Sequence, residues 1–359
     1  MRLLIAGGGT GGHLYPGMAV AEEVVRRGGQ VLFVGTARGL EARAVPAAGY
    51  ALELLEVSGL KRVGLMAVLR GLFRLPKAFF RSLSILRHFR PDVVLGVGGY
   101  ASGPVVMVAA LWGYPTAIQE QNSVPGITNR ILARLVQVVM VAFDEARRFF
   151  PARKTETIGN PVRSRLVTTL TAGGADPNPA PRILVVGGSQ GARAVNDLVL
   201  AAVEVLAKNG PLPALVHQTG PSDETRCSER YRAMGVADRI EVRPFIDDMA
   251  TAYHRASLVI ARAGALTLAE LAIAGRPAIL IPLPTATDDH QSKNAARFAA
   301  VSAAIVLNQR TSTAAELAQL LSDLLADSGR RQAMAAAMRS LARPKAAADI
   351  VDRLERLRA

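Results

Sequence analysis

The chain has 359 residues, half of them hydrophobic, with a formal net charge of +14 and a single cysteine. This length allows two domains with full cores, and the hydrophobic content excludes a disordered protein. The lone thiol, Cys227, cannot form an internal disulfide, which fits a reducing compartment. The basic balance leaves nucleic acid, an anionic membrane and anionic substrates open as partners.

Strand-like and helix-like segments alternate along the chain. Short apolar runs predict buried strands at 3–6, 31–34, 93–97, 138–142, 182–186, 215–218, 240–242, 258–261 and 278–282. Helices are predicted at 18–27, 78–89 and 346–357. Such alternation is typical of parallel sheets with helices on both faces, so we expect an α/β protein with two similar doubly wound domains.

The predicted domains are residues 1–163 and 182–340, followed by a C-terminal helix at 341–359 that we expect to pack back on the first domain. The linker is placed at 164–181, because 168–181 is rich in Thr, Gly, Ala and Pro. Ligands of doubly wound sheets bind beyond the carboxyl ends of the strands. We therefore expect the site in a cleft between the two domains.

Two segments bear on membrane contact. Residues 93–119 carry no charge and are long enough to span a bilayer, but seven Gly and Pro residues interrupt them, which favours a strand, a turn and a buried helix. Residues 61–90 contain eight Lys or Arg, no acid, and many bulky apolar side chains. That mixture suits the interface of an anionic bilayer, and two helices with a solvated basic face explain it equally well.

The first glycine-rich loop, residues 7–13 (GGGTGGH), follows the first strand and opens a helix. Backbone N–H groups at such a helix start bind anions. The loop also fits a dinucleotide fingerprint, but residues 34–37 supply no acid after the second strand, which argues against NAD. His13 lies at the rim of the loop and is our candidate for a general base, with a structural helix-start residue as the equal alternative.

A second glycine-rich loop, residues 187–193 (GGSQGAR), opens a helix in the second domain. Two such loops, one in each domain, indicate a nucleotide diphosphate better than either alone. Further glycine-rich or polar turns lie at 96–104, 120–123, 159–163, 261–270 and 288–294. The sequence contains no paired cysteines, metal-spaced histidines, P-loop or G-x-S-x-G elbow, which argues against zinc sites, P-loop NTPases and α/β-hydrolases.

Taken in order, the motifs at 7–13, 96–104, 120–122, 159–163, 187–193, 245–249, 262–270 and 290–294 resemble the MurG family of glucosaminyltransferases. The resemblance implies a GT-B fold and inverting transfer of GlcNAc from UDP-GlcNAc to the 4-hydroxyl of a lipid-linked muramyl-pentapeptide in peptidoglycan synthesis. It also implies a peripheral position on the cytoplasmic face of the plasma membrane, with an anionic membrane surface as partner. It implies no metal, no other cofactor and no nucleic acid.

The resemblance also assigns roles to residues. His13 would be the base, and the donor would contact Thr10, Gly11, Gly12, Asn122, Arg163, Ser189, Ile246, Ala265, Leu266, Thr267, Leu268, Ala269, Glu270 and Gln291. Two positions depart from the family pattern. Ala261 stands where a serine is common, and residues 61–64 replace a more glycine-rich loop, which bears on the acceptor side.

Three alternatives rank below this interpretation. One is another GT-B transferase that moves a UDP-sugar onto a different glycolipid. The second is an NAD-dependent oxidoreductase, and the third is a basic nucleic-acid-binding protein, for which binding would depend strongly on salt.

Overall fold

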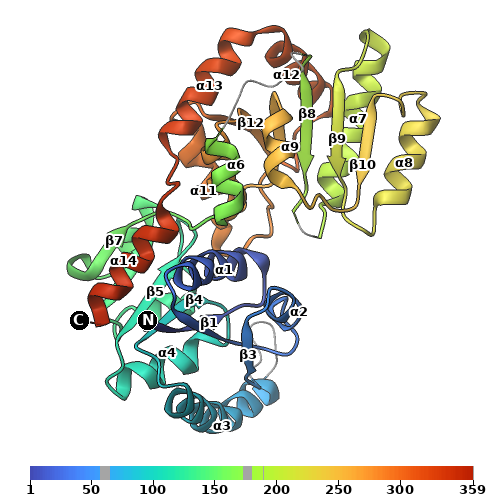
Figure 1. Cartoon of the computed structure of the whole chain (residues 1–359). Helices are drawn as coiled ribbons and strands as arrows, with labels where there is room; N and C mark the ends of the chain where they lie inside the picture. The colour runs from blue at the N-terminus through green and yellow to red at the C-terminus, as the bar shows by residue number, and fades with distance from the viewer. Residues whose placement is uncertain (57–64, 173–179, 189, 359) are drawn as a thin grey trace. The chain divides into compact units, whose positions relative to one another are not determined.

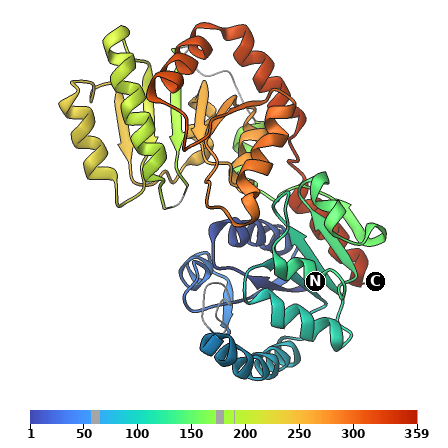
Figure 2. The same cartoon turned by 180° about the vertical axis from the view of Figure 1, so that it is seen from behind.

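The structure, a computed structural model, describes residues 1–56, 65–172, 180–188 and 190–358, and of residues 65–75 the backbone only. The chain forms two compact units. Unit 1 comprises Met1–Ser164 and Arg343–Ala359, and unit 2 comprises Arg165–Ala342. Figures 1 and 2 show them from opposite sides. Helix α6 (Ser164–Thr171) occupies the first part of the predicted linker, and residues 173–179 lie outside the described residues.

Unit 1 is built on one parallel sheet with the strand order β3-β2-β1-β4-β5-β6-β7. Its strands are β1 (Arg2–Gly7), β2 (Gln30–Gly35), β3 (Ala51–Leu54), β4 (Val93–Gly98), β5 (Thr116–Glu120), β6 (Val138–Val141) and β7 (Thr155–Thr157). Its helices are α1 (Gly11–Arg26), α2 (Glu41–Ala47), α3 (Leu65–Phe89), α4 (Ser102–Leu111), α5 (Ile127–Leu132), η1 (Asp144–Phe149), η2 (Ala152–Lys154) and α14 (Ala346–Arg358).

Strand β1 shows why apolar runs form this sheet. It pairs with β2 along one edge and with β4 along the other, and helices cover both of its faces. Leu4 and Ala6 join a cluster with side chains of α3 and α4, whereas Leu3 and Ile5 face side chains of α1 and α14. All four are 0% exposed. A strand buried on both faces needs a continuous apolar sequence, which is how this strand was predicted.

Unit 2 is a six-stranded parallel sheet with the order β10-β9-β8-β11-β12-β13. Its strands are β8 (Arg182–Val186), β9 (Ala214–Gln218), β10 (Ile240–Arg243), β11 (Leu258–Ala261), β12 (Ala278–Leu280) and β13 (Ala304–Val306). Its helices after α6 are α7 (Arg193–Asn209), α8 (Glu224–Ala233), α9 (Met249–Arg255), α10 (Ala265–Ala274), η3 (Thr287–Asp289), α11 (His290–Ala300), α12 (Ala314–Ala326) and α13 (Ser328–Ser340). In both units the chain order of the strands reverses once, between β1 and β4 and between β8 and β11.

The predicted pair of doubly wound α/β sheets is confirmed, with two corrections to helix bounds. Helix α1 begins at Gly11 rather than residue 18, because the helix continues directly out of the glycine loop. Helix α3 begins at Leu65 rather than residue 78. Residues 93–119 form the strand β4 and the helix α4, as expected, and they also include most of β5. Within the described residues, none of the helices has the length and apolar character to cross a membrane.

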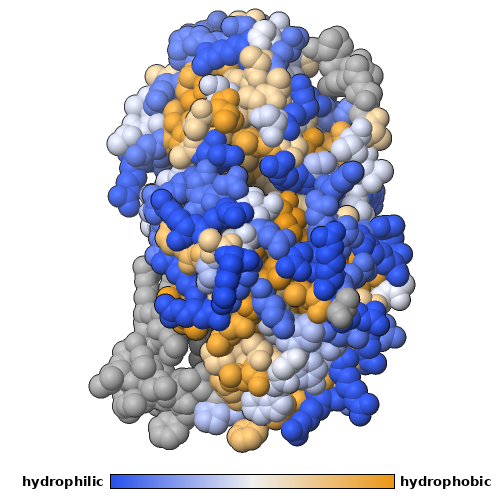
Figure 3. Space-filling model, turned by 90° about the vertical axis from the view of Figure 1, so that its left-hand side faces the viewer, coloured by the Kyte–Doolittle hydropathy of each residue, from blue (hydrophilic) through white to orange (hydrophobic). Residues whose placement is uncertain are grey.

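Some large apolar side chains of unit 1 face solvent. Phe80 on α3 is 74% exposed, Leu111 at the end of α4 is 62% exposed and Trp112 after it is 52% exposed. Helices α3 and α4 pack against each other. Figure 3 shows one face of the molecule, on which apolar side chains lie exposed between hydrophilic ones.

The C-terminal helix α14 packs in unit 1. Ile350, Val351 and Leu354 are buried in the same apolar cluster as residues of α1. At the edge of this contact, Arg27 Nη1 lies 2.6 Å from the Asp352 carboxylate. The last helix of the chain is therefore part of the core of the first unit.

Truncating the core side chain of α14 tests this packing. Leu354→Ala is expected to lower the free energy of unfolding by about 2 to 5 kcal/mol, because Leu354 is fully buried. Leu357→Ala, three residues on and partly exposed, should cost clearly less. Urea unfolding of both variants measures the difference, and equal losses would contradict the packing role of Leu354.

Candidate active site

In unit 1 the turn after β1 contacts the turn after β4. These strands are neighbours at the place where the strand order reverses, which we call the switch point of the unit. The Gly8 N–H donates to the Gly98 carbonyl oxygen at 3.3 Å. A Cβ added at Gly99 would lie 2.3 Å from the Gly8 carbonyl oxygen, so the two turns are in direct backbone contact. Only glycine allows so close an approach, and a side chain there would drive the turns apart.

His13 lies in the first turn of α1, half-buried above Gly98. Its Nδ1 is 2.8 Å from Gln121 Oε1. The amide nitrogen of Gln121 donates to the Val97 carbonyl at 3.0 Å, so its oxygen faces the imidazole. Nδ1 therefore carries the hydrogen, and Nε2 has the lone pair. Within the described part of the chain Nε2 makes no hydrogen bond, so it can accept a proton.

Glu120, at the end of β5, has a structural role. It is 1% exposed. Its carboxylate accepts from the Asn122 N–H at 3.0 Å, from Asn129 Nδ2 at 2.9 Å and from the Gly126 N–H at 3.3 Å. These bonds shape the loop after β5, and they leave Asn122 partly exposed at its surface. Of this motif, Asn122 alone is both ordered by the loop and accessible.

The other residues predicted in unit 1 gather around the start of α1. Thr10 and Gly12 are exposed and Gly11 is partly exposed. The guanidinium of Arg163 lies 5.7 Å from the centre of the Tyr15 ring, two residues after His13 in the same helix. Arg163 is itself exposed, so its charge is available near the N-terminal turns of α1. The structure thus brings together the residues that sequence predicted for this unit.

In unit 2, two helices start beside the switch point between β8 and β11. Helix α7 begins after Ala192 and α10 after Gly264, and neither N-cap residue has a side chain that can accept a hydrogen bond. Backbone N–H groups at the start of a helix bind anions. Ser189, predicted near the diphosphate, lies outside the described residues.

The α10 segment offers a mixture of backbone and side-chain contacts. Ala265 and Leu268 are buried, so only their backbone can reach a ligand, whereas Leu266, Thr267 and Ala269 are partly exposed. Those five residues and Glu270 are the first six residues of α10, which are between one and two turns of helix.

Glu270 is held in place from inside unit 2. The Tyr253 hydroxyl donates to Glu270 Oε2 at 3.0 Å. Burial and the neighbouring carboxylate raise the pKa of Tyr253 well above its usual value, so this hydroxyl keeps its proton. The bond fixes one carboxylate oxygen of Glu270, which stays partly exposed and can accept from a ligand hydroxyl.

Two further predicted residues lie in loops of unit 2. Gln291 Oε1 accepts from the Leu283 N–H at 2.9 Å, which directs the amide nitrogen of Gln291 away from that loop. Ile246 is half-buried between β10 and α9. The site residues of the two units remain two separate sets, and their union in one cleft stays a prediction.

Sequence reasoning missed a buried polar network beneath the second glycine loop. Asn196 Nδ2 donates to the Thr219 carbonyl at 2.9 Å, and His217 Nε2 lies 3.1 Å from Asn196 Oδ1. On the other side of the ring, the Tyr231 hydroxyl is 2.8 Å from His217 Nδ1. A Cβ added at Gly191 would lie 2.1 Å from the Thr219 oxygen, so the network supports the turn on which the glycine loop rests. Histidine within an apolar strand was the missed signal.

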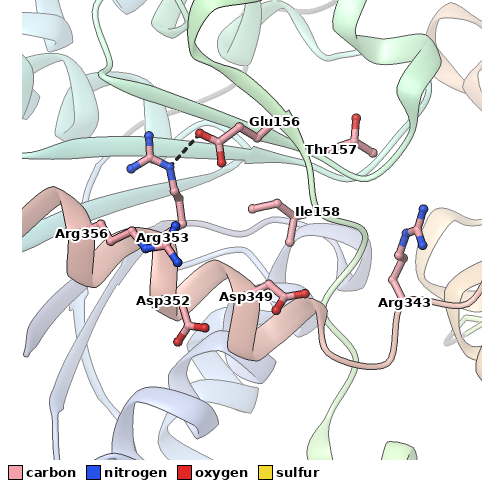
Figure 4. A pocket seen from close by; sticks show the side chains of 8 residues that line it. All are labelled: Glu156, Thr157, Ile158, Arg343, Asp349, Asp352, Arg353 and Arg356. Carbon is pink, nitrogen blue, oxygen red and sulfur yellow. Dashed lines mark hydrogen bonds and ion pairs between the residues drawn. The ribbon is translucent and has the colours of Figure 1, made fainter.

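Unit 1 also has a charged pocket, with a cavity volume of about 410 Å³. Figure 4 shows its lining, which comes from β7, α14 and the residues next to them: Glu156, Thr157, Ile158, Arg343, Asp349, Asp352, Arg353 and Arg356. Three arginines face three acids, and Arg353 Nε is 2.8 Å from Glu156. No residue of the predicted site lines this pocket, and its balanced charge does not favour an anionic ligand.

Two models of glycosyltransferase family 28 match the chain, the N-terminal domain over residues 3–141 and the C-terminal domain over residues 182–354. A protein of Anaeromyxobacter dehalogenans (strain 2CP-C) is 50% identical over 354 residues, which are 98% of this chain and 92% of that protein. A protein of Myxococcus xanthus (strain DK1622) is 49% identical with the same coverage. Both are named UDP-N-acetylglucosamine--N-acetylmuramyl-(pentapeptide) pyrophosphoryl-undecaprenol N-acetylglucosamine transferase.

Among solved structures, the crystal structure of Acinetobacter baumannii MurG matches with a TM-score of 0.80 and 34% identity, covering 99% of each chain. The chain belongs to the MurG branch of glycosyltransferase family 28. The family and the GT-B fold predicted from the order of the motifs are thereby confirmed. The calicheamicin glycosyltransferase CalG4, at 20% identity and a TM-score of 0.66 over 98% of each chain, shares the fold alone.

The His217 network predicts an acid-sensitive unit 2. Burial lowers the pKa of His217 to about 3, whereas the unfolded chain has a value near 6.5. Between these values the unfolded state binds the extra proton, so stability rises with pH and is lost as pH falls. Going from pH 7 to pH 5 should cost about 1 to 2 kcal/mol of unfolding free energy through this group.

The measurement is urea unfolding of wild type and His217→Gln at both pH values. The Arg226 guanidinium, hydrogen-bonded to Asp223, lowers the pKa of that carboxyl to about 2. Protonation of Asp223 therefore lowers the free energy of unfolding only at a pH below the range of this experiment. His217→Gln should be less stable at pH 7 and should lose less than wild type on going to pH 5. An unchanged difference between the two proteins would refute the assignment.

Proposed function

We propose that this chain transfers GlcNAc from UDP-GlcNAc to the 4-hydroxyl of an undecaprenyl-pyrophosphoryl muramyl-pentapeptide. The names of its relatives state this donor and this acceptor for them. The observation that carries the proposal is the pair of helix N-termini, of α7 and α10, at the switch point of unit 2. The family membership gives the substrate class, and this geometry gives a place for the donor's diphosphate.

Unit 2 would hold the UDP moiety. The N–H groups at the starts of α7 and α10 would bind the diphosphate, and the family motif assigns Ser189 to it as well. Glu270 would accept from the ribose hydroxyls, because Tyr253 already fixes its orientation. Ile246 would contact the base through its backbone, and Gln291 would contact the sugar.

Unit 1 would supply the chemistry at the acceptor. The muramyl hydroxyl oxygen attacks the anomeric carbon of GlcNAc while the bond from that carbon to the UDP oxygen breaks. The hydroxyl proton passes to Nε2 of His13, whose tautomer is set by Gln121. The resulting imidazolium keeps its bond to the Gln121 amide oxygen, which stabilises the charged form.

The leaving UDP gains negative charge in the transition state. Helix N-termini and an arginine can stabilise that charge without a metal, because they are fixed dipoles and charges that need no reorganisation. Arg163 is the candidate arginine, together with Thr10, Gly11 and Gly12 at the start of α1 and Asn122 at the sugar. These assignments rest on the family motif and on the accessibility of these residues in unit 1.

The acceptor's lipid tail places the reaction at a membrane, which we propose to be the cytoplasmic face of the plasma membrane. The exposed apolar residues of α3 and α4, with Arg87 and Arg90 at the end of α3, support peripheral contact with an anionic surface. Two of the basic residues contribute less than the sequence pattern suggested. Lys77 and Arg81 form ion pairs with Glu56 and Glu53.

The transfer reaction tests the function and the base together. Purified protein is given UDP-GlcNAc and a lipid-linked muramyl-pentapeptide analogue, and acceptor-dependent UDP release is measured. His13→Ala should lower kcat by about 100-fold or more with little change in the donor KM. His88→Ala, an exposed histidine on α3, is the control.

Three results would count against these assignments. Near-normal turnover by His13→Ala removes His13 as the base. Acceptor-independent UDP release by wild type contradicts transfer. Faster turnover with another UDP-sugar than with UDP-GlcNAc favours a different GT-B glycolipid transferase.

Membrane contact is tested with vesicles that contain one third anionic phospholipid. The double variant Phe80→Ser/Trp112→Ser should bind at least about 10-fold more weakly, because two exposed apolar side chains no longer enter the interface. Val301→Ser, an exposed apolar residue of unit 2, is the control. Equal binding by wild type and the double variant would remove this surface as the contact.

A further inference from the structure

A buried carboxylate that the mechanism does not use lies beneath the first glycine loop. Glu41, the first residue of α2, is 0% exposed. Its Oε2 accepts from the Gly9 N–H at 2.7 Å. Its Oε1 accepts from the Thr36 N–H at 2.8 Å and from the Thr36 hydroxyl at 2.9 Å. The side chain therefore joins the turn after β1 to the turn after β2.

Burying a carboxylate is costly unless its oxygens are hydrogen-bonded. Three donors meet this need for Glu41, and among the described residues no cation pairs with it. Three of roughly four acceptor positions are thus used inside the protein. Because the group has no exposed surface, its oxygens serve the chain itself rather than a ligand.

The surrounding sequence leaves room for this group. A Cβ added at Gly8, Gly35 or Gly39 would lie within 2.1 to 2.4 Å of an atom of the Glu41 side chain. Three glycines from two different turns therefore line one carboxyl group. Any side chain at those positions would displace the Glu41 carboxyl group, so the position of this group depends on the three glycines.

The first glycine loop, which Glu41 holds, is connected to the proposed base, His13, by direct contacts. Gly8, next to Gly9, donates to the Gly98 carbonyl at 3.3 Å. Gly98 in turn lies under the imidazole, where an added Cβ would be 3.0 Å from His13 Nδ1. Contacts thus run without a break from Glu41 through the two glycine turns to His13.

We propose that Glu41 is a positioning residue for the transfer reaction, holding the first glycine loop in the shape that places His13. In dinucleotide-binding folds an acid at the end of the second strand binds the ribose hydroxyls. Glu41 reaches the same strand end from α2, but its carboxylate accepts hydrogen bonds from Gly9 in the glycine loop and from Thr36. The inference rests on the proposed function, since it concerns the rate of that reaction.

The central test is Glu41→Gln. Each carboxylate oxygen accepts from a backbone N–H, so the amide nitrogen of glutamine would face either Gly9 N–H or Thr36 N–H, donor against donor. The loop should shift, and kcat should fall by about 10- to 100-fold. The Kd for UDP, measured by calorimetry, should change much less than kcat, because Glu270, Ile246 and the starts of α7 and α10, which are proposed to hold the nucleotide, lie in unit 2.

The controls separate positioning from folding and from the function itself. Glu53→Gln removes an exposed carboxylate of the same unit, ion-paired with Arg81, and should leave kcat unchanged. Thr36→Val keeps the carboxylate and both backbone bonds and removes only the hydroxyl donor. It should lower kcat by about 3-fold at unchanged UDP affinity, and it decides the question if Glu41→Gln does not fold.

The outcomes are distinct. Unchanged kcat in folded Glu41→Gln, or in Thr36→Val where the first variant does not fold, overturns the positioning role and leaves the transfer function standing. A wild-type protein that binds UDP but transfers no sugar overturns the proposed function instead. A fall in kcat and UDP affinity by the same factor shows a general loss of structure and also overturns positioning.

Discussion

The functional turns of this chain are stretches of bare backbone, and their shape depends on buried polar side chains that bond to them from inside the fold. In unit 1, Glu41 and Glu120 each accept from backbone N–H groups of the turns, and Gln121 joins β4 to His13. In unit 2, Asn196 and His217 support the turn beneath the second glycine loop. A buried polar group that loses its partner costs about 1 to 3 kcal/mol, so each bond restricts the turn to one shape. Glycine allows the backbone turns to approach each other closely, and these buried side chains make the turns rigid.

The two units have the same strand order around their switch points and use it differently. In unit 1 the strand end next to the first glycine loop is filled by the chain's own carboxylate, Glu41, so that edge is closed from within. In unit 2 helices α7 and α10 start after Ala192 and Gly264, which make no side-chain cap. The shared fold therefore does not determine the role of each half. Local polar contacts support the proposed division, in which one half holds the nucleotide and the other holds the base.

Much of the fold was predictable because strands buried on both faces, such as β1 and β8, leave continuous apolar runs in the sequence. The start of α1 was not, since glycine is a poor helix former and Gly11 and Gly12 read as loop. The positions of the unit 1 site residues followed from their place after strand ends. The contact of Glu41 with the glycine loop was not predicted, because the dinucleotide-binding fingerprint places the acid at the end of the second strand. Glu41 lies further along the chain, at the start of α2. The side chain of Leu268 turns inward, which the motif alone could not show.

His13 and His217 show why contacts, rather than residue type, decide chemistry. An amide oxygen bonds one ring nitrogen in each case, Gln121 with Nδ1 of His13 and Asn196 with Nε2 of His217. His217 is 0% exposed and its second nitrogen receives the Tyr231 hydroxyl, so burial lowers its pKa to about 3 and it stays neutral. His13 is half-buried, and within the described residues its second nitrogen has no partner. Two histidines with nearly the same first contact therefore differ in their surroundings. His217 completes a core network, and His13, the proposed base, keeps one ring nitrogen without a partner among the described residues.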